Sequence, residues 1–214
     1  MKSSKIKAVI FDMDGVLIDA KDWHYEALNK ALEFFGLAIS RYDHLTTYDG
    51  FPTRKKLEML SIEKSLPRGL HSFIAKMKQQ YTVEAIQTRC KPNFVHQYAL
   101  SRLKKEGYQM AVCSNSIRQT ITLMLEKAEL IKYIEFFISN EEVKNFKPDP
   151  EMYITAMNKL GLKPQECLIV EDNRQGLKAA KESKAHVLEV KDTVDANYEN
   201  IRHRIDEIDL GGKP

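Results

Sequence analysis

The chain begins with a short apolar run, rich in β-branched residues, at residues 6–11. A continuous apolar run of this length, followed at once by acidic residues and a glycine, is typical of a strand buried inside a parallel sheet. The apolar positions then change to helical spacing, because residues four apart between positions 23 and 35 form one face that ends at Gly36. The pattern therefore predicts a buried strand followed by a helix.

Residues 18–88 show helical patterns and no convincing strand. Residues 41–50 are polar and aromatic without a clear period, which indicates a loop or a broken helix. Thr53 is placed to cap a helix over residues 54–64. A longer helix is expected from about residue 67, because the apolar positions there follow a helical period.

From residue 91 onward, short apolar runs alternate with helical patterns. We expect strands at residues 108–113, 134–138, 167–170 and 186–190, and helices at residues 93–106, 117–128, 150–160, 175–184 and 196–208. Alternation of this kind predicts an α/β fold with a doubly wound, mostly parallel, Rossmann-like sheet. Residues 211–214 are expected to form a frayed tail.

The helical segment interrupts this alternation directly after the first strand. We therefore predict a discontinuous α/β core domain formed by residues 1–17 and 89–214, and an inserted all-helical cap domain at residues 18–88. An insertion after the first strand lies at the carboxyl end of the sheet, where ligands bind in such folds. The cap is therefore expected to cover the binding site.

Composition narrows the class of protein. The 214 residues are 29% charged and 43% hydrophobic, as in water-soluble globular proteins. The net charge of +3 and the scattered basic residues give no reason to expect a nucleic-acid partner. No apolar stretch approaches the ~18 residues of a membrane span, and no apolar signal region is present at the start. We expect a cytoplasmic protein without a membrane partner, a monomer with a dimer as the alternative.

Three cysteines form no CxxC pair and no even framework: Cys90, Cys113 and Cys167. Two of them lie in apolar, strand-like runs. Buried free thiols in a reducing compartment are therefore expected.

Two acidic residues, Asp12 and Asp14, follow the first predicted strand directly. Side chains two positions apart on an extended chain share one face. Two charges ~4 Å apart repel by about 4 kcal/mol at an effective dielectric near 20. A hard divalent cation with oxygen ligands would offset that repulsion, and Gly15 would let the chain turn sharply.

Further polar residues are expected at the same edge of the sheet. Ser114 and Asn115 follow one strand, Glu171 and Asp172 follow another, and Lys147 precedes a helix. Singly, these could be a helix cap, a solvated turn and an exposed lysine. Together they match a metal ion bound by carboxylates beside a bound anion. No P-loop, HExxH or GxSxG motif is present, so a carboxylate is the expected nucleophile.

The segments DMDGV, CSNS, KPDP and EDN, in this order, resemble the four motifs of the haloacid dehalogenase superfamily. The likeness is greatest to its β-phosphoglucomutase-like and sugar-phosphate phosphatase branch, which has a helical cap after the first motif. It extends over residues 6–190. The resemblance implies a Mg²⁺-dependent phosphatase that hydrolyses a small sugar or polyol phosphate monoester through an aspartyl-phosphate, with a phosphosugar mutase as the alternative.

The resemblance also implies a role for each motif residue. Asp12 is the nucleophile, and Asp14 is the general acid and then the base. The phosphoryl group is bound by Ser114, Asn115 and Lys147. The Mg²⁺ ligands are Asp12, the backbone carbonyl of Asp14, and Asp172, with Glu171 in or next to that shell. Haloacid dehalogenases proper lack an acid at the position of Asp14, so dehalogenation is not expected.

The chain departs from β-phosphoglucomutases at two positions. Those enzymes usually carry a threonine where Ala20 stands and an arginine where Thr53 stands, whereas here Arg54 comes one residue later. Loss of a hydroxyl that orients Asp14, and of a guanidinium that grips a remote phosphate, favours water as the phosphate acceptor. Residues expected to set substrate specificity from the cap are Thr53, Arg54, Lys78 and His24, the last with a purely structural role as its alternative.

Two other classes of function fit less well. A non-catalytic phospho-acceptor switch of the receiver type is also doubly wound, but receivers have no helical insertion after the first strand and carry their phospho-acceptor on a later strand. A catalytically silent binding module would not need every motif residue. The expected partner is a small phosphorylated metabolite.

Overall fold

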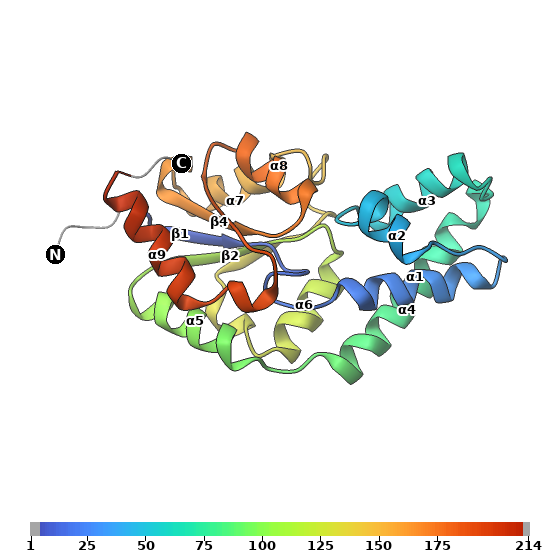
Figure 1. Cartoon of the computed structure of the whole chain (residues 1–214), viewed down its shortest axis with the longest axis horizontal. Helices are drawn as coiled ribbons and strands as arrows, with labels where there is room; N and C mark the ends of the chain where they lie inside the picture. Colours follow the sequence, from blue (N-terminus) through green and yellow to red (C-terminus); the bar gives the residue numbers. More distant parts are fainter. Residues whose placement is uncertain (1–4, 212–214) are drawn as a thin grey trace.

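A single parallel sheet organises the computed structural model, which describes residues 5–211. The strand order is β3–β2–β1–β4–β5, and every neighbouring pair is parallel. The strands are β1 (Ala8–Phe11), β2 (Gln109–Cys113), β3 (Phe136–Ile138), β4 (Cys167–Glu171) and β5 (His186–Glu189). β1 lies at the centre of the sheet (Figure 1).

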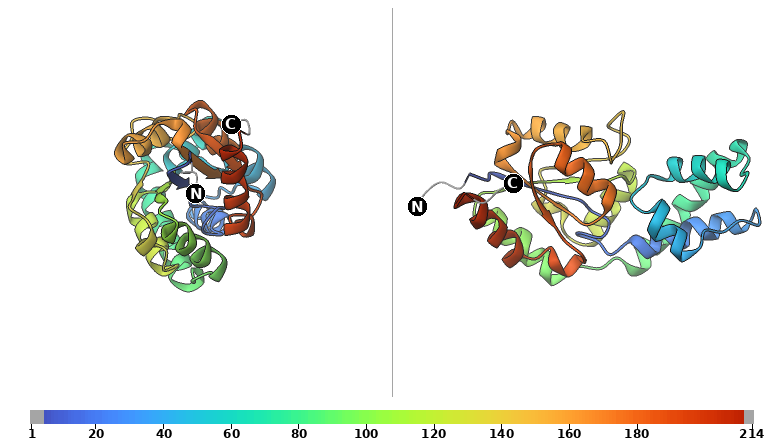
Figure 2. Two further views of the ribbon diagram at one scale, coloured as in Figure 1. Left: turned by 90° about the vertical axis from the view of Figure 1, so that its left-hand side faces the viewer. Right: turned by 45° about the horizontal axis from the view of Figure 1, so that its top comes forward.

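The side chains of β1 alternate between two hydrophobic clusters on opposite faces of the sheet. Val9 and Phe11 belong to one cluster, and Ala8 and Ile10 belong to the other. Figures 1 and 2 show helices on both faces of the sheet. The first cluster is closed by α5 (Phe94–Lys105), α6 (Arg118–Lys127) and α9 (Tyr198–Asp209), and the second by α7 (Glu151–Leu160) and α8 (Arg174–Glu182). The predicted doubly wound α/β class is therefore confirmed.

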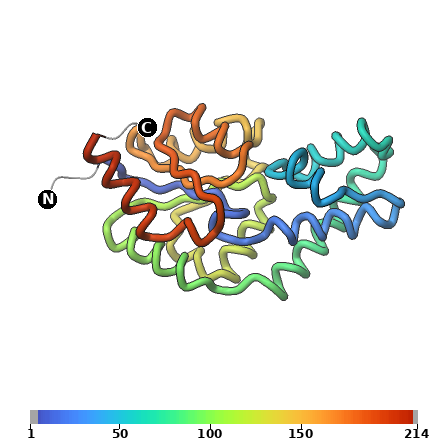
Figure 3. The backbone as a smooth tube through the Cα atoms, in the orientation of Figure 1, coloured from blue at the N-terminus to red at the C-terminus, as the bar shows by residue number. Residues whose placement is uncertain are grey.

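A group of helices lies between β1 and α5 along the chain and extends beyond the carboxyl ends of the strands (Figures 1 and 3). Its elements are α1 (Lys21–Glu33), α2 (Arg41–Asp43), the π-turn η1 (His44–Tyr48), α3 (Thr53–Glu63), the 3₁₀ turn η2 (Arg68–Leu70) and α4 (His71–Arg89). This helical block has its own hydrophobic cluster, which includes Leu32, Leu57 and Ile74. Its last helix also reaches the core, because Ile86 packs in the first core cluster.

Helix starts differ slightly from the sequence prediction. Thr53 is the first residue of α3, and Pro52 occupies the cap position. α7 begins at Glu151 with Pro150 before it, while Asp149 Oδ1 accepts a hydrogen bond of 2.9 Å from the Glu151 backbone N–H. The aspartate thus still satisfies one free N–H of the first turn.

The remaining short turns are 3₁₀ helices at η3 (Ile131–Tyr133), η4 (Pro164–Glu166) and η5 (Thr193–Asp195).

The broken helix expected at residues 41–50 is confirmed, because α2 passes directly into η1. Cys90, Cys113 and Cys167 are buried and free, as predicted. Of the predicted tail, residues 212–214 lie outside the described residues. Across residues 5–211 we find no helix with the length and apolar character needed to span a membrane.

Candidate active site

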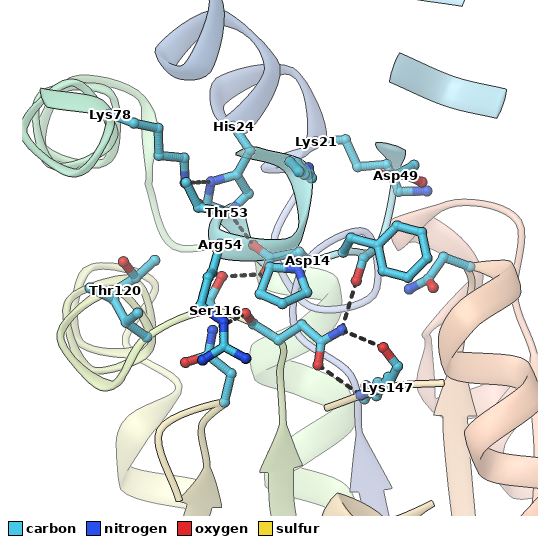
Figure 4. A pocket seen from close by; sticks show the side chains of 18 of the residues that line it. Asp14, Lys21, His24, Asp49, Thr53, Arg54, Lys78, Ser116, Thr120 and Lys147 are labelled. Atoms are coloured by element: carbon cyan, nitrogen blue, oxygen red, sulfur yellow. Dashed lines mark hydrogen bonds and ion pairs between the residues drawn. The ribbon is translucent and has the colours of Figure 1, made fainter. Parts of the chain in front are cut away.

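A cavity of about 280 Å³ lies between the carboxyl ends of the strands and the helical block (Figure 4). Most of the residues predicted from the sequence line it: Asp12, Asp14, His24, Thr53, Arg54, Lys78, Asn115 and Lys147. Three others are packed behind the wall. The side chains of Ser114, Glu171 and Asp172 are fully buried. The topology therefore gathers the motif residues at one edge of the sheet.

The ammonium of Lys147 is the electrostatic centre of the core wall. Its Nζ donates to Asp12 Oδ1 at 2.7 Å, to Glu171 Oε2 at 2.8 Å and to the Cys113 carbonyl at 2.8 Å. Burial alone would lower the pKa of Lys147, but the two carboxylates raise it above its ordinary value. All three ammonium hydrogens are thus used within the protein, and the lysine compensates acidic charge at the strand ends.

Three carboxylates form a compact acidic cluster. Asp12, Glu171 and Asp172 each place one oxygen within 4.8 Å of the others. Burial and the charge of Glu171 raise the pKa of Asp12, and burial raises that of Asp172 to about 6. Among the described residues, Asp172 Oδ2 makes no hydrogen bond, although the ammonium of Lys21 lies beside it as an ion-pair partner. A buried cluster of three carboxylates, which offers only oxygen donors, fits a hard divalent cation.

The Asp14 carboxylate is not part of that cluster. His24 Nε2 lies 3.0 Å from Asp14 Oδ1, and the hydroxyls of Ser114 and Ser116 donate to Asp14 Oδ2 at 3.1 and 2.9 Å. Burial alone would raise the pKa of Asp14, but the charge and hydrogen bond of His24 and the Ser116 hydroxyl lower it to about 2. Asp14 is therefore an ionised, oriented acceptor at neutral pH.

A lysine of the helical block stands behind His24. Lys78 Nζ, from α4, lies 3.0 Å from His24 Nδ1 (Figure 4). Burial and nearby Lys56 lower the pKa of Lys78 to about 7, and burial and Lys78 lower the pKa of His24. Either the ammonium donates to a neutral imidazole or the imidazolium donates to a neutral amine. In both states the pair carries one positive charge, and the Nε2–H of His24 points to Asp14.

The Asn115 amide is occupied by backbone groups. Its Nδ2 donates to the Gly50 carbonyl at 2.7 Å and to the Lys147 carbonyl at 3.2 Å, while its Oδ1 accepts from the Lys147 N–H at 3.1 Å. Asn115 thus orients the Lys147 segment and joins it to the loop before α3. A direct contact of this side chain with phosphate stays a prediction.

Two glycines let the strand ends approach closely. Gly15 has φ +99°, and a Cβ atom there would collide with Asp172 Oδ2. A Cβ atom on Gly176, in α8, would collide with the Glu171 carboxylate. The backbone itself therefore forms part of the packing around the acidic cluster.

Several functional neighbours escaped the sequence analysis. Tyr153 donates from its hydroxyl to Glu171 Oε2 at 2.5 Å, yet in the sequence it is one more aromatic residue on the apolar face of a helix. Lys21 could not be singled out from the sequence, where its one notable feature is the acidic residue Asp22 beside it. Ser116 could have been found, since it belongs to the same Ser-Asn-Ser run as Ser114, but a helix cap explained it equally well.

Arg54, which the sequence did single out, borders the cavity with a largely exposed side chain that pairs with Glu58 at 3.6 Å.

Replacement of Lys147 tests its role in charge compensation. Lys147→Met leaves Asp12 and Glu171 buried without their counter-charge, so we expect the free energy of unfolding to fall by about 3–5 kcal/mol in EDTA. Mg²⁺ should recover part of the loss, because a cation at the acidic cluster replaces the missing charge. Urea denaturation with and without Mg²⁺ measures both effects. Lys144→Met, at an exposed position of the same loop, is the matched control, and equal stability of both variants would contradict the prediction.

Comparison with known sequences identifies a family and several relatives of this chain. A family model described as haloacid dehalogenase-like hydrolase matches residues 9–190. A phosphorylated carbohydrates phosphatase of Thermotoga maritima is 28% identical over 176 residues, which cover 82% of this chain and 81% of that protein. A phosphoglycolate phosphatase of Aquifex aeolicus is also 28% identical over 176 residues, with coverage of 82% and 80%.

Solved structures show the same fold. A β-phosphoglucomutase from Clostridium difficile superposes with a TM-score of 0.82 at 23% identity, covering 94% of this chain and 98% of that chain. The matching relatives named as phosphatases bear out the expectation of an enzyme. The chain belongs to the haloacid dehalogenase-like hydrolase family, as a hydrolase of the phosphatase type.

Proposed function

We propose that the protein is a Mg²⁺-dependent phosphatase that hydrolyses a small sugar or polyol phosphate monoester through an aspartyl-phosphate at Asp12. One observation carries the proposal. Asp12 lines the cavity at the end of the central strand with Oδ1 held by Lys147, and Asp14, two residues on, is held by His24 and two serines. A nucleophile and an acid–base group thus face one cavity in fixed orientations.

In the first proposed step, Asp12 attacks phosphorus, the bond to the ester oxygen breaks, and Asp14 protonates the departing alkoxide. An ionised Asp14 must first take up a proton. A bound phosphate dianion favours this, because a nearby like charge raises the pKa of a carboxylate. The hydroxyls of Ser114 and Ser116 keep Asp14 in place meanwhile.

In the second proposed step, Asp14 accepts a proton from water, the water oxygen attacks phosphorus, and the bond to Asp12 breaks. Inorganic phosphate leaves with both aspartates restored. The acidic cluster of Asp12, Glu171 and Asp172, with the Asp14 carbonyl, would hold Mg²⁺, which when bound supplies positive charge for the phosphoryl oxygens.

Hydrolysis is favoured over mutase activity because Thr53 stands where mutases carry an arginine. The effect of the departure at Ala20 stays a prediction, while in this structure the hydroxyls of Ser114 and Ser116 donate to Asp14. A mutase stays the second candidate. The observation in its favour is a pair of lysines, Lys56 and Lys78, on the helical side of the cavity, because a mutase must hold a second phosphate.

A cap domain at residues 18–88 is part of this proposal. Its support is the separate hydrophobic cluster of the helical block, and its proposed role is to exclude water from the cavity. A cytoplasmic location and a monomeric or dimeric state stay predictions.

Removal of the metal tests the acidic cluster. Without Mg²⁺ the carboxylates Asp12 and Asp172 repel an incoming phosphate, so hydrolysis of p-nitrophenyl phosphate should vanish in EDTA and return with excess Mg²⁺. Ca²⁺ should inhibit, because it tolerates looser geometry and more ligands. Full turnover in EDTA would contradict the metal assignment.

Replacement of the nucleophile tests the covalent step. Asp12→Asn keeps the side-chain size but removes the attacking charge, so turnover should fall by at least about 10³-fold, and acid-quenched enzyme should carry no phosphate on this residue. Asp19→Asn, on the exposed side of the same segment, is the matched control. Circular dichroism confirms folding of both variants. Substantial activity in Asp12→Asn would point to direct attack by water.

The products distinguish hydrolysis from mutase activity. The enzyme with Mg²⁺ is incubated with hexose and polyol phosphates, and both inorganic phosphate and isomeric esters are measured. We expect phosphate release in proportion to the ester consumed. Conversion of β-glucose 1-phosphate to the 6-phosphate without phosphate release, stimulated by a trace of bisphosphate, would establish the mutase instead.

A further inference from the structure

The helical side of the cavity contains a buried lysine whose ammonium has no polar partner among the residues that the structure describes. Lys56, on α3, lines the cavity and is 7% exposed. Among residues 5–211 its ammonium has no carboxylate within 4.0 Å and no side-chain hydrogen bond. Burial lowers its pKa, and the charges of Asp49 and Asp14 only partly oppose this. A buried ammonium without a hydrogen-bond acceptor is costly for a fold to keep.

Two further donors face the same space. Lys78 has His24 as its hydrogen-bond partner and is repelled by Lys56. His44, in η1, is 2% exposed and lines the cavity, and neither ring nitrogen has a hydrogen-bond partner among the described residues. Burial and the charge of Lys56 lower the pKa of His44 to about 4, so the imidazole is neutral and offers one N–H.

These donors belong to the helical side of the cavity, opposite the core residues of the proposed phosphoryl site. Lys56, Lys78 and His44 come from α3, α4 and η1 of the helical block, whereas Asp12 and Lys147 come from the core. The cavity of about 280 Å³ places both groups in reach of one small molecule. The carboxylate on the helical side, Asp49, lies beyond ion-pair distance of Lys56.

We propose that Lys56, with Lys78 and His44, binds a second anionic group of the substrate, a carboxylate or a second phosphate. This inference rests on the proposed function and narrows its substrate to a small phosphate ester with an anionic far end. An oxyanion there would accept hydrogen bonds from Lys56 and separate the two repelling lysines. It would thereby offset the cost of burying the ammonium. Lys56 is then a specificity-determining residue.

The test uses propyl phosphates that differ only in their far end: a hydroxyl, a carboxylate or a second phosphate. With Mg²⁺, the wild-type kcat/KM for at least one anionic ester should exceed that for the hydroxyl ester by about tenfold or more, as expected for a charge-assisted hydrogen bond. Lys56→Met should remove this advantage, so that kcat/KM falls by about tenfold more for the anionic ester than for the hydroxyl ester. The better of the two anionic esters identifies the group as carboxylate or phosphate.

Two controls make the result specific to the charge of Lys56. Lys55→Met, at the neighbouring position outside the cavity lining, should keep the wild-type preference. Lys56→Arg should retain part of the preference for the anionic ester.

The melting temperature is a separate test. Lys56→Met should unfold at the same or a higher temperature than the wild type without ligand, because an uncompensated buried charge has been removed. A lower melting temperature would mean that Lys56 is structural, which would overturn the proposal.

Binding measurements keep the inference independent of turnover. Propylphosphonates with the same three far ends can be titrated calorimetrically into wild-type enzyme and Lys56→Met in the presence of Mg²⁺. Tighter binding of an anionic analogue, lost in Lys56→Met, supports the subsite even if no ester is hydrolysed and the proposed function fails. Equal affinity for all three analogues, or an equal loss for all three in Lys56→Met, would overturn the subsite while hydrolysis of the hydroxyl ester still stands.

Discussion

The site depends on one ammonium group held among acidic strand ends. Lys147 Nζ contacts a residue directly after β1, the last residue of β2 and the last residue of β4, namely Asp12, the Cys113 carbonyl and Glu171. Without it, two buried carboxylates would face each other in a medium of low dielectric, where an uncompensated charge costs several kcal/mol. Further hydrogen bonds hold Glu171 and Lys147 in these positions. Tyr153 binds the same oxygen of Glu171, and the Asn115 amide fixes the backbone of Lys147.

The two sides of the cavity have opposite electrostatic character. The core side carries the acidic cluster, which is compensated by Lys147 and by Lys21 from α1, and the helical side carries Lys56 and Lys78. The sides meet at Asp14, whose carboxylate lies on the core side and is hydrogen-bonded by His24 from α1. Asp14 is therefore oriented by the helical block through His24 and by the core through Ser114 and Ser116, whereas Asp12 Oδ1 is held by Lys147 of the core.

The sequence predicted the core side well, and topology is the reason. Carboxyl ends of parallel strands meet at one edge, so polar residues after strands, such as Asp12, Ser114 and Asp172, can be assigned to one site without knowledge of side-chain geometry. The helical side could not be predicted in this way. Lys56 and His44 stand out only because their side-chain nitrogens have no hydrogen-bond partner among the described residues, and that is a property of three-dimensional packing. The resemblance to mutases also drew attention to Thr53 and Arg54, which precede the buried lysine of the same helix.

The hydrogen bond from Asn115 to the Gly50 carbonyl connects the core to the helical block with a single backbone contact. Any displacement of the Gly50 loop away from β2 breaks it, and one such bond contributes about 1 kcal/mol net. A free energy of this size corresponds to about a fivefold ratio between conformations with and without this hydrogen bond. Because the same amide also holds the backbone of Lys147, whose ammonium donates to Asp12, the Gly50 loop and the Asp12 carboxylate are joined by an unbroken series of hydrogen bonds through Asn115 and Lys147.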